Sequence, residues 1–386
     1  MQRTKAPHIA IAGAGIAGLS SAIALRKLGC NVVIFEAAPE IKPLGAGLVL
    51  AANAIKGLQR IGIADKVIPA GQALTRFSIL THEGRTLSQG DSEALNRRFG
   101  LSNFVIHRGD LHRILLEELN DVTLQTGKKA TGVEQDTEGV TLHFQDNTRY
   151  KADYLIVADG VHSAIRQQLL PGSSPRYAGY TCWRAVVENP GIALSHATET
   201  WGPAGRMGIV PLRNQQIYWF LCVNAPQNSP EMKALKVADL YQRLRNYHAP
   251  VPQILEASSN DQLLWNDIVD VKPIRQYAFN RILLTGDAAH ATTPNMGQGA
   301  CQAIEDAAVL MDVWEKQAGE SPEALFRTVE KRRLPRATMI VERSWQLGKI
   351  AQWEHPWLVT LRNGLLPFMP PSVNERQIKT LFEVDF

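Results

Sequence analysis

The sequence has no long apolar run, few cysteines and no concentrated block of charge of one sign. No stretch of about 18 apolar residues occurs, so no membrane-spanning helix is expected. The four cysteines (Cys30, Cys182, Cys222 and Cys301) stand far apart without a CxxC pair, which argues against a disulfide framework and a metal site. Lys and Arg total 41 against 37 Asp and Glu, spread along the chain, so a nucleic-acid partner is not expected.

The length and composition are those of a globular protein. The 386 residues, 45% hydrophobic and 20% charged, suit a soluble protein of about two or three domains. A strand-like segment follows the amino terminus almost at once, without the charged and then apolar segments of a secretion signal. We therefore expect a cytoplasmic protein, and the sequence leaves monomer and homodimer open.

Hydrophobic patterning predicts an α/β protein. A buried strand over residues 8–12, a glycine-rich turn, a helix ending at Gly29 and the buried strand NVVIFEA form a strand–turn–helix–strand unit. Between residues 180 and 223 the pattern becomes strand-like and rich in aromatic residues, which predicts a separate antiparallel sheet. Helical patterns dominate the carboxyl-terminal part.

The first chemical signal is GAGIAG at residues 13–18, between a predicted strand and a predicted helix. Glycines at this spacing permit a tight turn, a close backbone approach to a pyrophosphate and tight packing of helix on strand. The helix N-terminus offers free N–H groups and partial positive charge to phosphates. The second strand leads into Glu36, whose carboxylate is placed to accept hydrogen bonds from ribose hydroxyls. The alternative is an ordinary glycine turn beside a surface glutamate.

Two acidic residues and one arginine stand at further predicted strand ends. Asp287 follows the strand RILLT and precedes a second glycine-rich loop, which opens the long helix CQAIEDAAVLMDVWEK. Asp159 ends the strand YLIVAD, and Arg108 ends VIHR just before a helix. Ligands of open α/β sheets bind at the carboxyl ends of strands, so these side chains are candidate ligand contacts. The alternatives are turn or helix caps for the acids and a solvated surface group for the arginine.

Together these elements resemble the group A flavoprotein monooxygenases, a family of aromatic hydroxylases with a para-hydroxybenzoate-hydroxylase-like fold. GAGIAG with Glu36 matches the family's motif for FAD, ADGVHSAIR its DG motif, and LLTGDAAHATTPNMGQGACQAIEDA its GD motif. The resemblance covers nearly the whole chain, including GAGLVLAANAIKGLQRIG and EKRRLPRA. It implies a Rossmann-like FAD-binding domain (1–72, 104–177 and 273–330), an interleaved antiparallel-sheet domain for the substrate (73–103 and 178–272) and a C-terminal helical region (331–386).

The resemblance also implies which residues bind the cofactor. The glycine turn faces the pyrophosphate, Asp287 a ribityl hydroxyl, and residues 297–300 the pyrimidine edge of the flavin. Asp159 belongs to the DG motif, which in the family also serves the nicotinamide cofactor. The full set of implied cofactor contacts is Gly13, Ala14, Gly15, Gly18, Glu36, Ala37, Arg108, Ala130, Asp159, Asp287, Gly297, Gln298, Gly299 and Ala300.

The implied activity is hydroxylation of a small aromatic or polycyclic substrate, in which NAD(P)H reduces FAD and O₂ then forms a flavin hydroperoxide. Arg206 and Tyr218 match positions that point toward the flavin in related hydroxylases and are the candidate catalytic residues, whereas Trp183 is expected in the core. Some branches carry an acid where this chain has Asn295, and an amide takes no proton at neutral pH. Either the substrate arrives activated, a base lies elsewhere, or the reaction is an epoxidation or a heteroatom oxidation.

Other functions stay open on the sequence alone. A plain NAD dehydrogenase would share the glycine motif but would not need the DG and GD motifs. A flavin-dependent epoxidase or a drug-inactivating hydroxylase would have the same fold. A flavin-containing ligand-binding protein without turnover is an alternative from another class. The sequence decides neither the substrate nor the choice between NADH and NADPH.

Overall fold

A six-stranded sheet forms the centre of one half of the molecule, which a computed structural model describes for residues 6–42, 46–91, 103–368, 381 and 383–386. Its strand order is β18-β19-β12-β1-β2-β8, parallel except for β18 at the edge. The strands are almost wholly buried and rich in Ile, Val and Leu, as expected when both faces of a sheet are covered. They are β1 (His8–Ala12), β2 (Asn31–Phe35), β8 (Thr123–Gln125), β12 (Tyr154–Val157), β18 (Ala278–Phe279) and β19 (Ile282–Leu284).

Helices cover one face of this sheet and a small antiparallel sheet covers the other. Helix α1 (Ile16–Lys27) packs against the long helix α11 (Gly299–Lys316). On the opposite face, the Phe35 ring of β2 contacts the rings of Phe144 and Tyr150. These two rings belong to the sheet of β9 (Ala130–Gln135), β10 (Val140–Phe144) and β11 (Arg149–Ala152).

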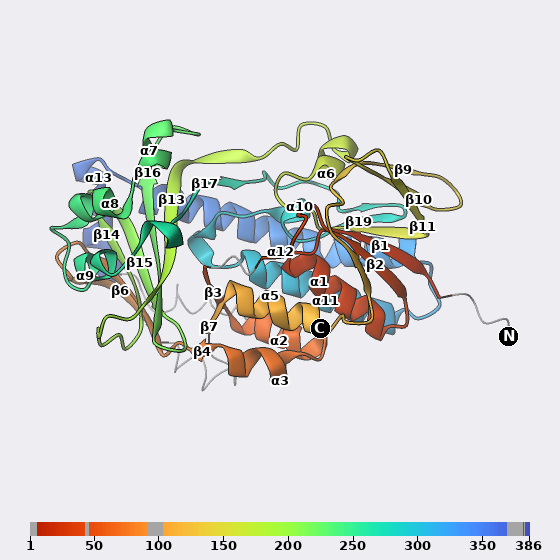
Figure 1. The fold of residues 1–386 in the computed structure, drawn as a ribbon, viewed down its shortest axis with the longest axis horizontal. Helices are drawn as coiled ribbons and strands as arrows, with labels where there is room; N and C mark the ends of the chain where they lie inside the picture. The colour runs from red at the N-terminus through yellow and green to blue at the C-terminus, as the bar shows by residue number, and fades with distance from the viewer. Residues whose placement is uncertain (1–5, 43–45, 92–102, 369–380, 382) are drawn as a thin grey trace.

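A seven-stranded sheet forms the other half, at the left of Figure 1, in the order β17-β13-β16-β15-β14-β5-β6. Neighbours are antiparallel, as the sequence predicted, except that β14 and β5 run parallel because β5 comes from a distant part of the chain. Helices α8 (Val237–Leu244) and α9 (Val251–Glu256) cover one face of this sheet, its back face, and Trp183 is fully buried there, which confirms its expected place in the core. The strands are β5 (Arg76–Thr81), β6 (Thr86–Asp91), β13 (Arg176–Glu188), β14 (Ala197–Gly202), β15 (Gly205–Pro211), β16 (Gln216–Asn224) and β17 (Leu264–Asp270).

A third small sheet and several helices lie between and around the two large sheets. The sheet has the order β3-β7-β4, and its bounds are β3 (Gly47–Leu50), β4 (Gln72–Ala73) and β7 (Phe104–His107). The remaining short helices are α2 (Ala52–Arg60), α3 (Ala64–Val67), α5 (Arg108–Glu117), α6 (Ala164–Leu169), α7 (Pro230–Ala234), α8 (Val237–Leu244), α9 (Val251–Glu256) and α10 (Asp287–His290). Single 3₁₀ turns are η1 (Ile68–Ala70), η2 (Asn260–Gln262), η3 (Pro294–Met296) and η4 (Leu366–Phe368).

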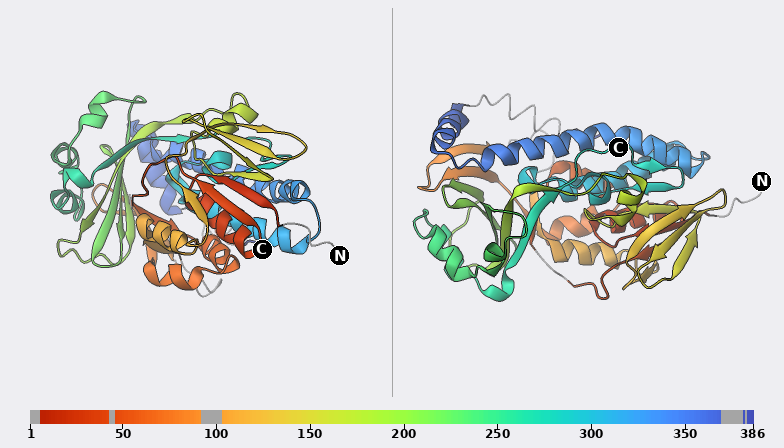
Figure 2. Two further views of the ribbon diagram at one scale, coloured as in Figure 1. Left: turned by 45° about the vertical axis from the view of Figure 1, so that its right-hand side comes forward. Right: turned by 90° about the horizontal axis from the view of Figure 1, so that it is seen from above.

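The helix α12 (Pro322–Ala351) runs along the molecule from the six-stranded sheet to the seven-stranded one (Figure 2). It therefore links the two halves, and α13 (Pro356–Leu365) follows it beside the seven-stranded sheet. No helix in the described part of the chain is long and apolar enough to cross a bilayer. Residues 92–102, within the expected substrate domain, and 369–380, within the expected C-terminal region, lie outside the described residues.

Candidate active site

The predicted cofactor motifs follow four strands that are neighbours in the six-stranded sheet. In the spatial order β19, β12, β1 and β2, these strands lead into Asp287, Asp159, the 13–18 turn and Glu36 respectively. Because the four strands are parallel, their carboxyl ends meet at one edge of the sheet. Ligands of open α/β sheets bind outside this edge, so the fold gathers motifs distant in sequence into one candidate site.

Hydrogen bonds connect the glycine turn to the end of β2. The Gly13 N–H donates to the Phe35 carbonyl at 2.7 Å, and the Ala14 N–H donates to Glu36 Oε2 at 2.8 Å. Glu36 Oε1 accepts a second bond from the Ala38 N–H at 2.8 Å. Glu36 is therefore held beside the turn by backbone donors, at the position where the sequence analysis placed the ribose contact.

A buried arginine connects the DG and GD motifs. Arg166, in α6 just after Asp159, is fully buried. Its Nη1 donates to the Ala288 carbonyl at 3.3 Å, and its Nη2 donates to the Val161 carbonyl at 2.7 Å. The guanidinium therefore ties the loop after β12 to the loop after β19.

Three glycines of the 13–18 turn meet three different steric requirements. A Cβ on Gly13, whose φ is +106°, would lie 2.2 Å from the Ala158 carbonyl oxygen, so the turn and the DG strand touch there. A Cβ on Gly18 would lie 1.9 Å from the Gly13 carbonyl oxygen, so α1 packs closely on the turn. A Cβ on Gly15 would meet nothing within 4 Å. Only Gly15 faces open space, which is where a pyrophosphate could approach the backbone.

The carboxyl groups of the two aspartates of the site both have raised pKa values. Burial raises the pKa of the Asp159 carboxyl to about 6, and its Oδ1 is buried with no hydrogen-bond donor. Asp287 is exposed, although surrounding protein atoms raise the pKa of its carboxyl, an effect opposed by His290, Arg108 and Arg166. Hydroxyl groups of a bound ligand would donate hydrogen bonds to Asp159 Oδ1 and to the Asp287 carboxylate.

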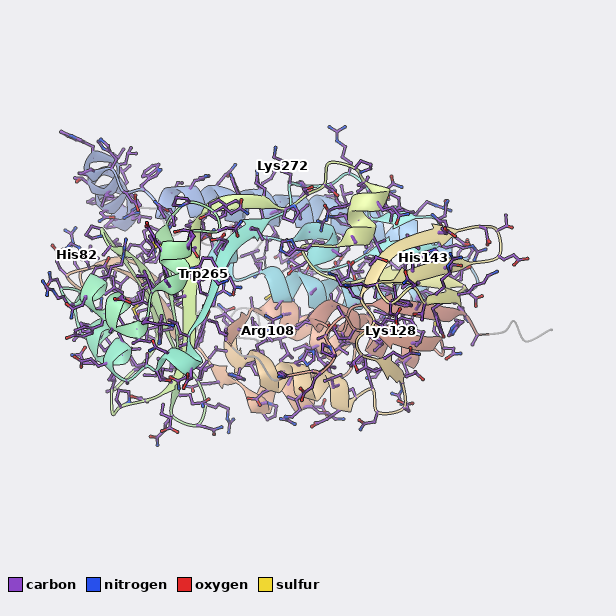
Figure 3. All side chains as sticks on the ribbon, turned by 45° about the horizontal axis from the view of Figure 1, so that its top comes forward. His82, Arg108, Lys128, His143, Trp265 and Lys272 are labelled. Carbon is purple, nitrogen blue, oxygen red and sulfur yellow. The ribbon has the colours of Figure 1, made fainter. Side chains whose placement is uncertain are left out.

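The other implied cofactor contacts lie around the same edge. Arg108 begins α5, is exposed, and lies near the middle of the molecule, close enough to influence Asp287 (Figure 3). The segment leading to Ala130 is hydrogen-bonded to the loop after β2 through Lys128 N and the Glu36 carbonyl at 2.8 Å. Ala37 is exposed in that loop. Ala37 and the segment leading to Ala130 therefore lie beside Glu36.

The loop at residues 297–300 forms the N-terminus of α11. Gly297 is exposed with φ +62°, a left-handed conformation, and a Cβ on it would meet nothing within 4 Å. The Gln298 side chain is buried and accepts hydrogen bonds from Asn53 and Gln302, so it points into the protein. The backbone N–H groups of Gly299 and Ala300 remain at the helix start. A helix N-terminus stabilises negative charge, so the loop suits the electron-rich pyrimidine edge of a flavin.

Arg206 lies at the junction of the seven-stranded sheet, the GD loop and α12. It is 5% exposed, and it donates to Glu199 at 2.7 Å, Asn295 at 2.9 Å and Gln352 at 2.6 Å. Glu199 and Gln352 escaped the sequence analysis because they are distant in sequence and match no motif. The structure thus makes Arg206 a link between the strands of one half and the cofactor loop of the other.

Asn295 is fully engaged in the same network. Its Oδ1 accepts from Arg206 and from the Tyr180 hydroxyl at 3.2 Å, and its Nδ2 donates to Thr293 Oγ1 at 2.9 Å and the Ser344 carbonyl at 3.0 Å. Tyr180 was also missed, although strand alternation places it opposite Trp183 and therefore on the face toward the cofactor half. The amide at this position has no spare group for proton transfer.

Tyr218 lies on the face of the seven-stranded sheet opposite Trp183, its front face, and packs against the small sheet of β3, β4 and β7. Its ring occupies the place that a Cβ on Gly47 would enter, at 2.6 Å. Burial raises the pKa of the Tyr218 phenol well above its ordinary value, so the hydroxyl stays protonated at neutral pH and can donate a hydrogen bond. Partly exposed Val186, Arg184 and Phe220 share this face. The strand pairing places Arg206 and Glu199 on this face as well, so the face combines apolar side chains with charged ones.

The residues at the sheet edge fit FAD. The open side of Gly15, the unpartnered Oδ1 of Asp159 and the exposed carboxylate of Asp287 are suited to a pyrophosphate and to sugar hydroxyls. The glycine-rich N-terminus of α11 is suited to the flavin ring. Among the described residues, no group of three or more His, Cys, Asp or Glu side chains is arranged to hold a metal ion.

Comparisons with known proteins bear on the family and the cofactor. A family model described as an FAD binding domain matches residues 7–344. The chain is 38% identical over 362 residues to the aurachin C monooxygenase/isomerase of Stigmatella aurantiaca, with 94% of each chain covered. It is 32% identical over 382 residues to the 2-heptyl-3-hydroxy-4(1H)-quinolone synthase of Pseudomonas aeruginosa, with 97% of each covered. The solved structure of Klebsiella pneumoniae HpxO complexed with FAD and uric acid has a TM-score of 0.88 and 30% identity, covering 97% of this chain and 96% of that one.

The two-sheet fold and the strand-end site define a flavoprotein of the Rossmann-like class. The chain belongs to the family of FAD-dependent aromatic hydroxylases and monooxygenases, which confirms the resemblance seen in the sequence. It is an FAD-dependent monooxygenase, and the non-catalytic alternative is not supported.

Proposed function

We propose that this enzyme uses NAD(P)H and O₂ to insert one oxygen atom into a quinolone-type substrate, a bicyclic nitrogen heterocycle that carries an apolar chain. The observation that carries the proposal is Asn295, an amide whose acceptor and donor atoms are all bound by protein groups. A phenol usually requires deprotonation before its ring attacks an electrophilic oxygen. A 4-quinolone requires none, because the ring nitrogen already donates electron density to C3.

Two further observations support this substrate class. The front face of the seven-stranded sheet presents the partly exposed apolar groups Val186, Tyr218 and Phe220, which suit an apolar ring and chain. The similar proteins from Stigmatella and Pseudomonas are named for aurachin C and for a heptyl quinolone. The protonated Tyr218 hydroxyl would donate to a ring carbonyl and so orient the substrate.

In this proposal the cofactor residues keep the roles that the resemblance implies. Bound FAD would supply the electron transfer and the oxygen chemistry, while the protein supplies binding, orientation and exclusion of water. Asp287 and Asp159 would accept hydrogen bonds from hydroxyl groups of the nucleotides, and the N-terminus of α11 would stabilise negative charge on the reduced ring. We place the enzyme in the cytoplasm, where NAD(P)H is supplied.

The test is an oxygenation assay with a panel of ring systems. The purified enzyme is supplied with NADH or NADPH and with a 2-alkyl-4(1H)-quinolone, salicylate or urate, and pyridine-nucleotide oxidation and product mass are followed. We expect the quinolone to accelerate oxidation and to yield a product heavier by one oxygen atom. Hydroxylation of salicylate or urate without reaction of the quinolone would overturn the substrate proposal while leaving the FAD-dependent monooxygenase intact.

An amide rather than a base at position 295 favours epoxidation of the C2–C3 bond as much as 3-hydroxylation, because epoxidation also needs no deprotonation of the substrate. An epoxide and a 3-hydroxy product have the same mass gain but differ in the carbon spectrum. Nuclear magnetic resonance of the product from the same assay distinguishes them, since only the epoxide contains two sp³ ring carbons.

Replacing Arg206 by alanine is expected to lower kcat/KM by about 100-fold, because the sheet and the GD loop lose the side chain that aligns them. FAD content should remain that of the parent, since the hydrogen bonds of Arg206 go to Glu199, Asn295 and Gln352 and not to Asp287, Asp159, Glu36 or the 13–18 turn. Steady-state kinetics and the flavin absorbance of the purified variant measure the two effects. Arg213→Ala, an exposed arginine beyond the same strand, is the matched control. Parental kcat/KM in Arg206→Ala would remove Arg206 from the active site.

A further inference from the structure

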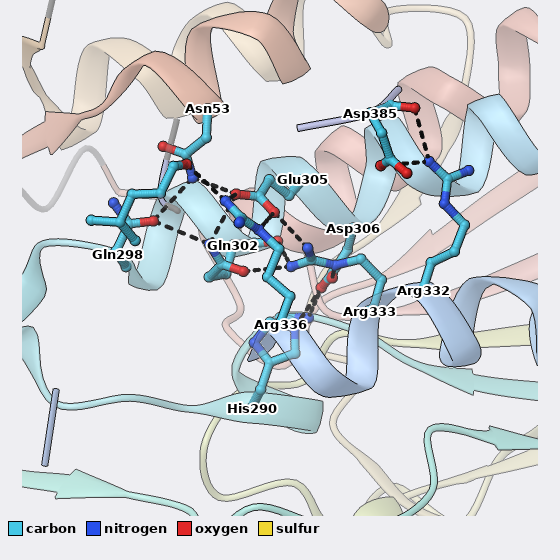
Figure 4. Close-up of polar contacts among 12 residues, drawn as sticks. Asn53, His290, Gln298, Gln302, Glu305, Asp306, Arg332, Arg333, Arg336 and Asp385 are labelled. Carbon is cyan, nitrogen blue, oxygen red and sulfur yellow. Dashed lines mark hydrogen bonds and ion pairs between the residues drawn. The ribbon is translucent and has the colours of Figure 1, made fainter. Parts of the chain in front are cut away.

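A cluster of buried charges lies between α11 and α12, directly behind the two cofactor loops (Figure 4). Helix α11 contributes Glu305 and Asp306, and α12 contributes Arg333 and Arg336. The exposed fractions of the first three are 0%, 3% and 2%. Arg333 Nε donates to Asp306 Oδ1 at 2.7 Å, and its Nη1 donates to Glu305 Oε2. Buried ion pairs give little net stability, so stability alone does not explain why this cluster lies behind the two loops.

One branch of the cluster leads to the GD motif. Asp306 Oδ2 accepts a hydrogen bond from the Gly286 backbone N–H at 2.7 Å and another from His290 Nε2 at 2.8 Å. Gly286 immediately precedes Asp287, and its φ of +55° sets the direction in which the chain leaves β19. The orientation of the Asp306 carboxylate thus determines where the Asp287 backbone begins.

The second branch leads to the loop at the N-terminus of α11. Glu305 Oε1 accepts from Asn53 Nδ2 and from Gln302 Nε2, the latter at 3.0 Å. Both amide groups also donate to Gln298 Oε1, Asn53 at 3.0 Å and Gln302 at 3.1 Å. Arg333 Nη2 donates to Gln302 Oε1 at 2.7 Å and so fixes the orientation of that amide. Gln298 immediately precedes Gly299, the first residue of α11.

We propose that Arg333 is a positioning residue for FAD, which holds the loop for the ribityl chain and the loop for the flavin ring in register. Its guanidinium contacts the acid of each branch directly, whereas Arg336 forms an ion pair with Glu305 and donates a hydrogen bond to the Leu381 carbonyl at 2.8 Å. A planar fork with several donors can fix two carboxylates at once. Arg333 itself touches neither loop's cofactor-facing side, so it acts through Asp306 and through Gln302.

The test compares Arg333→Met with Arg332→Met, a matched control one residue earlier in α12. Arg332 points away from the cluster and pairs with Asp312 at 2.6 Å and Asp385 at 3.1 Å (Figure 4). The FAD dissociation constant of each apoprotein is measured by quenching of flavin fluorescence, and urea unfolding of the apoproteins is measured in parallel. We expect Arg333→Met to weaken FAD binding at least tenfold, about 1.4 kcal/mol. The FAD dissociation constant of Arg332→Met should stay within twofold of the parental value, even if the urea midpoint of this variant falls.

Arg333→Lys provides the second variant. It keeps a positive charge between the carboxylates, which protects folding, but a single ammonium cannot span both branches. We expect it to fold and to bind FAD at least tenfold more weakly than the parent. The fluorescence of the bound flavin should be quenched less completely, because the loop at residues 297–300 is less constrained. FAD binding within twofold of the parent in either folded variant would overturn the proposal. Failure of both variants to fold would also overturn it, because Arg333 would then serve the fold as a whole.

Discussion

Replacing Gly13 by alanine is expected to destabilise the apoprotein by about 3 kcal/mol or more and to abolish FAD retention. The reason is steric: the new Cβ would lie 2.2 Å from the Ala158 carbonyl oxygen, and the residue would have to keep a φ of +106°. The neighbour is backbone at the end of a central strand and cannot move aside without disturbing β12. Urea unfolding of the apoprotein and the flavin absorbance of purified protein measure the two effects.

Gly15→Ala is the matched comparison, because this glycine has an ordinary φ of −75° and a Cβ on it would meet no protein atom within 4 Å. We expect apoprotein stability within about 0.5 kcal/mol of the parent. FAD affinity should nevertheless fall strongly, because the methyl group enters the space where the pyrophosphate approaches the backbone. The steric account of this turn would be wrong if Gly15→Ala kept the parental FAD affinity. It would also be wrong if Gly13→Ala had the parental free energy of unfolding.

Replacing Asp287 by alanine is expected to weaken FAD binding about 10- to 100-fold, the value of a hydrogen bond to a charged acceptor. The apoprotein should become no less stable. Desolvation by surrounding protein atoms raises the pKa of the Asp287 carboxyl above its unfolded value, so the folded apoprotein loses stability as the pH rises through the folded pKa. Alanine removes that loss, so the apoprotein of the variant should be more stable than the parental apoprotein at neutral pH.

Fluorescence titration with FAD and urea unfolding of the apoprotein at two pH values test this prediction. Asp312→Ala is the control, because Asp312 lies on α11 but pairs with Arg332 and Lys316 away from the strand ends. It should lower stability and leave FAD affinity unchanged. An Asp287→Ala variant that binds FAD like the parent would show that the carboxylate does not contact the cofactor.

The sequence alone determined the local parts of the site. The spacing of the glycines at residues 13–18 and the distance to Glu36 are properties of one strand–turn–helix–strand unit. A short connection between neighbouring elements leaves few possible geometries. The parallel strands were recognisable for the same reason, since continuous apolar runs indicate burial on both faces. The family, FAD and the interleaved fold were predictable because the three motifs resemble those of a known family, and the comparisons confirm them.

Only the tertiary structure decided how distant segments meet. No pattern in the sequence indicates that β12 lies between β1 and β19, that Gln298 turns inward, or that Arg206 joins Glu199, Asn295 and Gln352. The cluster centred on Arg333 was equally invisible, because arginines and acids are abundant on the surfaces of helices. Such contacts depend on how whole elements pack and exclude water, and this packing depends on all the chain at once rather than on any short stretch of it.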